Sequence, residues 1–159
     1  VVFDLSGHVA IMDNGRGMSR SALLQNMRGL GRGESRRGDP RANFGIGMKA
    51  VASIQNPSGV IITSWQRDDA KAWQIILGEI EEGRYGLIQF SNGELANQVS
   101  IPRSPVRGER FDSGTMVQLT DTEFRPYVTL KYLNDRLLQL PDGQEVTVWG
   151  TLHGEPNGY

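Results

Sequence analysis

A carboxylate followed by closely spaced glycines is the first feature of this sequence that could do chemistry. Asp13 begins the run D-N-G-R-G-M, directly after an apolar stretch that is expected to form a buried strand. A carboxylate there would be held at the edge of a sheet, while Gly15 and Gly17 would let a flat ligand approach the backbone. An ionised carboxylate only accepts hydrogen bonds, so it suits an exocyclic amine such as that of adenine. Taken alone, the same run is also typical of a plain Asn-Gly turn.

A second glycine-rich run, N-F-G-I-G-M-K-A, extends from Asn43 to Ala50 and leads into a predicted helix. Backbone N–H groups left open by the glycines, the positive helix end and Lys49 would together favour a phosphate. The run also satisfies the dinucleotide pattern G-x-G-x-x-A, but that pattern needs a preceding strand, and residues 36–41 are too charged and too rich in Gly and Pro. A Walker A loop is excluded by the spacing of the glycines and by the lack of a terminal Gly-Lys-Ser/Thr.

A third candidate is the run S-G-T at Ser113–Thr115, which precedes the apolar segment Met116–Leu119. The hydroxyl of Thr115 would stand at the mouth of a strand, where it could bind a ligand. Alone, such a residue is also a common hydrophilic start to a strand.

The charge of the chain is unevenly distributed. Between Arg16 and Arg41 there are seven arginines and only two acidic residues, which gives this segment a charge of +5. The remainder has ten basic and sixteen acidic residues, or −6, so the total is −1. A basic segment on an acidic body favours a small anionic ligand over duplex nucleic acid, which needs a broad basic surface. The alternative is a solvated charged loop.

The elements that must position these residues follow from hydrophobic periodicity and breakers. Strands are expected as a hairpin within 1–13 that turns at Ser6-Gly7, and then at 59–65, 72–80, 85–90, 116–119 and 145–149. Helices are expected from Ser19 to Gly29, from Gly45 onward and over 128–140. Residues 29–43 are expected to form a mobile loop, 92–112 an irregular segment and 151–159 an extended or frayed end. This order predicts one α+β domain built as a two-layer sandwich, over 1–150, with 151–159 as a tail.

Composition narrows the class of protein. The chain has 159 residues, 38% hydrophobic and 22% charged, which is typical of a globular domain. It has no Cys and only two His, so disulfides, thiolate metal sites and multi-histidine metal sites are excluded. No apolar run approaches the roughly 20 residues that span a bilayer, so we expect a cytoplasmic or nuclear protein without a membrane partner. Because the chain starts with Val1 rather than Met, we expect it to be part of a longer protein.

Together, in this order, the three motifs resemble the ATP-binding domain of the GHKL superfamily. That superfamily comprises gyrase B, the ninety-kilodalton heat-shock chaperones, sensor histidine kinases and MutL, with the MORC ATPases close by. The resemblance extends over about Val9 to Leu119 and is strongest to the chaperone and MORC versions. It implies the Bergerat ATP-binding fold, a mixed, mostly antiparallel sheet with helices on one face.

On the base side, the resemblance implies that Asp13 accepts the adenine amine directly and through water. Gly17 and Met18 would line the base pocket beside Gly15, and Thr115 would join the water network around the base.

On the phosphate side, the resemblance implies that Asn26 faces the sugar and phosphates. A basic lid over residues 28–43 would close over the nucleotide, and Arg32 or a neighbouring arginine would pair with a phosphate. The backbone of the second motif would bind the phosphates, with Lys49 nearby. Its residues in contact with the nucleotide are Gly45, Ile46, Gly47 and Met48.

The family's first motif, a helix with a Mg²⁺-binding Asn and a catalytic Glu, has no counterpart among the twelve residues before Asp13. We therefore expect ATP or ADP with Mg²⁺ as ligands, the protein ligand of the metal upstream of Val1, and no catalytic residue that can be named within the chain. ATPase activity is expected of the full-length protein.

The resemblance implies that ATP closes the lid and controls the conformation or association of a larger protein, with further domains and a nucleotide-dependent homodimer as partners. Nucleic acid is not indicated for this domain. Two alternatives stay open. One is the catalytic domain of a sensor histidine kinase, and the other is a nucleotide-binding module without hydrolysis.

Overall fold

A computed structural model describes residues 2–4, 9–28, 55–103, 110–121, 147–152 and 155–158. Within these ranges lie the helix α1 (Arg20–Arg28), a helical residue at Gln55 and one sheet of nine strands. The strands are β1 (Val2–Asp4), β2 (Val9–Asp13), β3 (Val60–Trp65), β4 (Ala72–Glu81), β5 (Arg84–Leu87), β6 (Asn97–Val99), β7 (Gly114–Leu119), β8 (Thr147–Leu152) and β9 (Glu155–Gly158).

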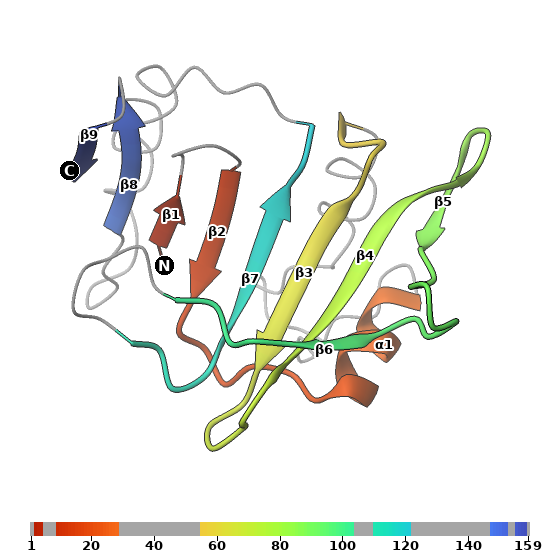
Figure 1. Cartoon of the computed structure of the whole chain (residues 1–159), viewed down its shortest axis with the longest axis horizontal. Helices are drawn as coiled ribbons and strands as arrows, with labels where there is room; N and C mark the ends of the chain where they lie inside the picture. Colours follow the sequence, from red (N-terminus) through yellow and green to blue (C-terminus); the bar gives the residue numbers. More distant parts are fainter. Residues whose placement is uncertain are drawn as a thin grey trace, which may run out of the picture.

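The sheet has the order β5-β4-β3-β7-β2-β1-β8-β9, and β6 pairs with β4 (Figure 1). Its pairs are antiparallel except for β1 and β8, which run parallel. A mixed, mostly antiparallel sheet with a helix packed on it confirms the α+β class. The expected hairpin of β1 and β2 and the expected meander of β3, β4 and β5 are both present.

Some of the predicted boundaries are wrong. Strand β5 ends at Leu87 rather than Phe90, although Ile88 N–H still donates to Ile76 O at 2.9 Å. The chain turns just beyond, where Gly93 N–H donates to Phe90 O at 2.8 Å and Phe90 N–H to Glu94 O at 2.9 Å. The segment expected to be irregular contains β6, which was missed because three residues are too few to show a period. Strand β8 continues to Leu152 and pairs with β9, so the end that was expected to be extended or frayed is extended at these residues and lies in the sheet.

Several predictions lie outside the described residues. They are the helix from Gly45, the helix over 128–140 and the lid over 28–43. Of the lid, only Arg28 is described, at the end of α1.

Helix α1 begins as the sequence predicts. Ser19 caps it, since Ala22 N–H donates to Ser19 Oγ at 3.3 Å and Leu23 N–H to Ser19 O at 2.9 Å. Leu23 and Leu24 are buried and pack against a cluster from β3 and β4. The other buried members of this cluster are Val60, Ile62, Ile75, Leu77 and Ala96. Burial of these apolar side chains holds α1 on the sheet.

The two faces of the sheet carry separate clusters. Successive side chains of a strand point to opposite faces, so Val60 and Ile62 lie on the α1 face while Trp65 lies on the other. Trp65 is fully buried there with Met12 and Ala72. The α1 face and the end of the strands together position the candidate site.

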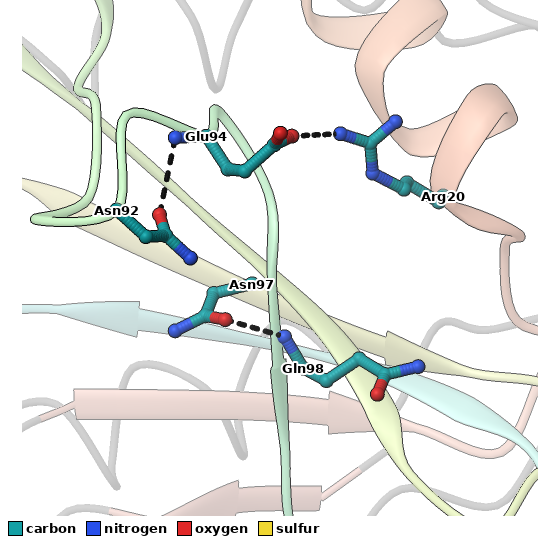
Figure 2. A network of polar contacts seen from close by, with 5 residues as sticks. All are labelled: Arg20, Asn92, Glu94, Asn97 and Gln98. Atoms are coloured by element: carbon teal, nitrogen blue, oxygen red, sulfur yellow. Dashed lines mark hydrogen bonds and ion pairs between the residues drawn. The ribbon is translucent and has the colours of Figure 1, made fainter.

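Polar contacts fix the start of α1 over the edge of the sheet. Arg20 forms an ion pair with Glu94, which precedes β6, and Figure 2 shows the two side chains reaching toward each other. The guanidinium carbon of Arg20 also lies 5.8 Å from the ring centroid of Trp73 in β4. The loop that carries Glu94 is shaped by Asn92, whose Oδ1 accepts the N–H of Glu94 at 3.1 Å. Helix α1 is thus held by charge at its first residue and by apolar burial along its length.

Candidate nucleotide site

Strands β2 and β3 end, and strand β7 begins, at the same end of the sheet (Figure 1). In the register of the strands, Asp13 lies opposite Thr115, and Thr115 lies opposite Ser64. These three residues therefore form one row across β2, β7 and β3. Directly opposite residues of antiparallel strands have Cβ atoms about 5 Å apart, so the row brings a carboxylate and two hydroxyls together.

The row lies on the face of the sheet that α1 covers. Ser64 is two residues from Ile62 and Thr115 two from Val117, and both of these apolar residues belong to the α1 cluster. Since side chains alternate along a strand, Ser64 and Thr115 share this face. The apolar cluster thus ends in a polar row at the strand ends.

The carboxylate of Asp13 is half-buried, and its own loop holds it in place. Gly15 N–H donates to Asp13 Oδ1 at 2.8 Å. Within the described part of the chain, Oδ2 has no hydrogen-bond partner. Asp13 therefore offers an oriented acceptor that the fold does not use.

Sequence reasoning missed Ser64, which is completely buried. Its Oγ accepts the N–H of Met18 at 2.8 Å, donates to Gly114 O at 3.0 Å and lies 2.9 Å from Thr115 Oγ1. The only available signal was a pair of hydroxyl residues, Thr63 and Ser64, in the otherwise apolar run V-I-I-T-S-W. Ser64 links the D-x-G-x-G loop to the S-G-T motif, which lie about 100 residues apart in the sequence.

Two glycines allow the backbone segments of the site to approach closely. A Cβ on Gly17, whose φ is +67°, would lie 1.7 Å from Trp65 O. A Cβ on Gly114 would lie 2.1 Å from Asp13 O. Neither neighbour is a movable side chain, so only glycine fits at these two positions.

Met18 and Asn26 also meet beside the row. Asn26 Nδ2 donates to Met18 Sδ at 3.4 Å, and both side chains are partly buried. Because the N–H of Met18 binds Ser64, this contact joins α1 to the three-residue row. The structure thus brings together the candidates Asp13, Gly15, Gly17, Met18, Asn26 and Thr115.

The other candidates, Arg32 and Gly45 to Lys49, lie outside the described residues. The described ranges contain no group of three His, Cys, Asp or Glu side chains that would hold a metal ion. None of the helices in those ranges is long and apolar enough to cross a membrane.

Comparison with known proteins identifies the family. A family model described as histidine kinase-, DNA gyrase B- and HSP90-like ATPase matches residues 4–102, which is more than half of the chain. The match includes the Asp13 loop and the run from Asn43, and it ends before Thr115, which the register nevertheless places opposite Asp13. No curated protein matches the chain. The chain therefore belongs to the histidine kinase-, DNA gyrase B- and HSP90-like ATPases, the GHKL superfamily.

Proposed function

We propose that this chain binds ATP with its adenine at the row formed by Asp13, Thr115 and Ser64. The observation that supports this most strongly is the pairing of an unused carboxylate oxygen on Asp13 with a hydroxyl on Thr115 at the same register position. A purine amine would donate to Asp13 Oδ2, and a water at Thr115 would join the amine to the sheet. The plane of the base would lie against Gly15 and Gly17 of this loop, because a glycine presents no side chain to it.

The remainder of the nucleotide would extend toward α1 and the second glycine-rich motif. Asn26 lies beside Met18, whose N–H binds Ser64 of the row, and this position suits a contact with the sugar or a phosphate. We further propose that the backbone of residues 45–48, with Lys49 nearby, binds the phosphates and that Arg32 or a neighbouring lid arginine pairs with one of them. A lid over 28–43 with net positive charge would be drawn onto the polyphosphate.

Closure of this lid would couple nucleotide binding to the conformation or association of a larger protein. Family membership supports ATP as the ligand, and Mg²⁺ with it, since a divalent ion neutralises phosphate charge in such sites. The described residues include no group of three His, Cys, Asp or Glu side chains that would hold this ion without the nucleotide. The histidine kinase and the non-hydrolysing module remain the alternatives, and a turnover assay with the purified full-length protein separates the latter from an ATPase.

The base contact is tested by Asp13→Asn with isothermal titration calorimetry. The variant keeps an oxygen that can accept from Gly15 N–H but places an amide donor where the purine amine donates. A hydrogen bond to a charged group contributes about 1.5–3 kcal/mol, so ATP affinity should fall about 10- to 150-fold.

Asp69→Asn is the matched control. Asp69 also accepts a backbone N–H from its own turn, that of Gln66 at 2.8 Å, but it is not in the row. Its variant should bind ATP like the wild type. Unchanged affinity in Asp13→Asn would refute the proposed site.

A further inference from the structure

The hydroxyl of Ser64 uses all of its hydrogen-bonding capacity within the protein. The side chain has no exposed surface, and its Oγ has three partners: Met18 N–H, Gly114 O and Thr115 Oγ1. A hydroxyl offers one proton and two lone pairs, which is the number of contacts present. The direction of each contact can therefore be assigned.

Only one assignment satisfies all three contacts. Gly114 O has no proton, so the proton of Ser64 must point to it, at 3.0 Å. Met18 N–H can only donate, so it takes one lone pair of Ser64. The remaining lone pair can serve Thr115 only if the hydroxyl of Thr115 donates to Ser64, over 2.9 Å. The proton of Thr115 is thereby used inside the protein.

We infer that Ser64 is a positioning residue that sets base specificity by keeping Thr115 as an acceptor. With its proton directed at Ser64, Thr115 presents only lone pairs toward the ligand side of the row. Asp13, directly opposite Thr115, likewise presents only lone pairs there. The row is therefore uniformly accepting and favours a purine that carries an amine at C6.

A 6-oxo purine meets this row unfavourably. It places an acceptor oxygen where the amine of a 6-amino purine donates, which leaves acceptors facing one another. Sites built to bind one pattern of donors and acceptors reject the opposite pattern strongly, because polar groups are left unpaired. Without Ser64, the hydroxyl of Thr115 would be released to rotate and to donate toward such an oxygen, directly or through a water.

The ratio of the dissociation constants for ITP and ATP measures this effect. The two nucleotides have the same sugar and triphosphate and differ at C6 and N1 of the base. We expect Ser64→Ala to lower the ratio Kd(ITP)/Kd(ATP) at least fivefold in calorimetry. If the role of Ser64 were purely structural, Ser64→Ala would weaken the binding of both nucleotides equally and leave the ratio of dissociation constants unchanged.

Thr63→Val is the matched control, because Thr63 is an equally buried hydroxyl on the same strand but points to the opposite face. Its Oγ1 accepts from Gln74 Nε2 at 3.1 Å. This variant should keep the wild-type ratio. If Ser64→Ala does not fold, Ser64→Cys keeps the side-chain size, and its weakly accepting sulfur should lower the ratio in the same direction.

A double variant tests whether Ser64 acts through Thr115. In the Thr115→Val background there is no hydroxyl to release, so Ser64→Ala should no longer change the ratio. Since the inference rests on the proposed function, the two fail in different ways. Wild-type protein that does not bind ATP overturns the proposed function. ATP binding with an unchanged ratio in Ser64→Ala and Ser64→Cys, or a ratio that still falls in the Thr115→Val background, overturns the role of Ser64 alone.

Discussion

The two ends of the central strands β3 and β7 are closed by different means. At the site end, backbone segments touch around the buried hydroxyl of Ser64: Gly17 lies against Trp65 O and Gly114 against Asp13 O. At the opposite end, side chains make the closure. Asn56 Oδ1 accepts the N–H of Asp121 at 3.0 Å, and Asp121 Oδ2 accepts the N–H of Ser58 at 2.6 Å.

This difference separates stability from binding. At the opposite end, carboxylate and amide oxygens bind main-chain N–H groups from distant parts of the chain, so these contacts hold the fold together. At the site end, Asp13 binds only its own loop and keeps one oxygen without a partner among the described residues. Similar side chains thus stabilise the opposite end and, at the site end, leave an acceptor for the ligand that we propose.

The largest effect is expected where a side chain is introduced into the backbone contact at the site end. Gly17→Ala would add a Cβ 1.7 Å from Trp65 O, in a residue with φ of +67°. The left-handed conformation alone costs about 1–2 kcal/mol for a residue with a side chain. The clash with a main-chain atom should raise the loss to several kcal/mol, enough to unfold a domain of ordinary stability.

Gly83→Ala separates the cost of the left-handed backbone conformation from the cost of the clash. Gly83 has nearly the same φ, +72°, but nothing lies within 4 Å of its Cβ position. Urea denaturation followed by circular dichroism should show only the conformational cost for this variant. Equal losses for both variants would mean that the backbone contact at Gly17 contributes nothing.

At the opposite end, Asn56→Ala should reduce stability without reducing affinity. Asn56 is 1% exposed, and its removal leaves the N–H of Asp121 without its acceptor. Loss of such a partner costs about 1–3 kcal/mol. The ATP affinity of the folded variant should stay within about twofold of wild type, a difference of less than 0.5 kcal/mol. A large loss of affinity at conditions where the variant is folded would contradict the separation of the two ends.

How far the sequence predicts these two ends depends on how far apart in the sequence the contacting residues lie. Strong local patterns predicted β2, β3, β7 and α1 with its Ser19 cap. They also placed Asp13 and Thr115 at strand ends. Ser64 was missed because its role depends on the register between β3 and β7, whose residues are 51 apart in the hydrogen bond to Thr115. The hydrogen bond between Asp121 N–H and Asn56 Oδ1 was missed for the same reason, since these residues are 65 apart in the sequence.

A smaller and more selective effect is expected at Gly15. A Cβ there would lie 2.8 Å from Asp13 Oδ1, which is a movable side-chain atom, and Gly15 has no positive φ. Gly15→Ala should therefore change the free energy of unfolding by less than about 0.5 kcal/mol. Displacement of the carboxylate should weaken ATP binding about three- to tenfold, or about 0.7–1.4 kcal/mol.

The Asp13→Asn background provides the control for Gly15→Ala. If alanine acts by moving the carboxylate, it should have little further effect on affinity once the carboxylate has been replaced. An undiminished effect in that background would point to a direct contact between residue 15 and the ligand.

The smallest effect is expected at the ion pair of Arg20 and Glu94, which lies on the surface and supports neither end of the central strands directly. The side chains are 43% and 56% exposed, so solvent screens the attraction and Glu94→Gln should cost less than about 0.5 kcal/mol.

Arg20→Met should cost somewhat more, up to about 1 kcal/mol, because it also removes the cation from the ring of Trp73. The difference between the two variants should persist in 1 M salt, where the ion pair is screened but the stacking over the ring is largely retained. Arg84→Met is the matched control, because Arg84 pairs with Glu81 at 2.6 Å at a more exposed position and stacks on no aromatic ring of the described residues. If Arg20→Met were no more costly than Arg84→Met, Trp73 would not hold Arg20, and apolar burial of Leu23 and Leu24 alone would fix α1 beside the site.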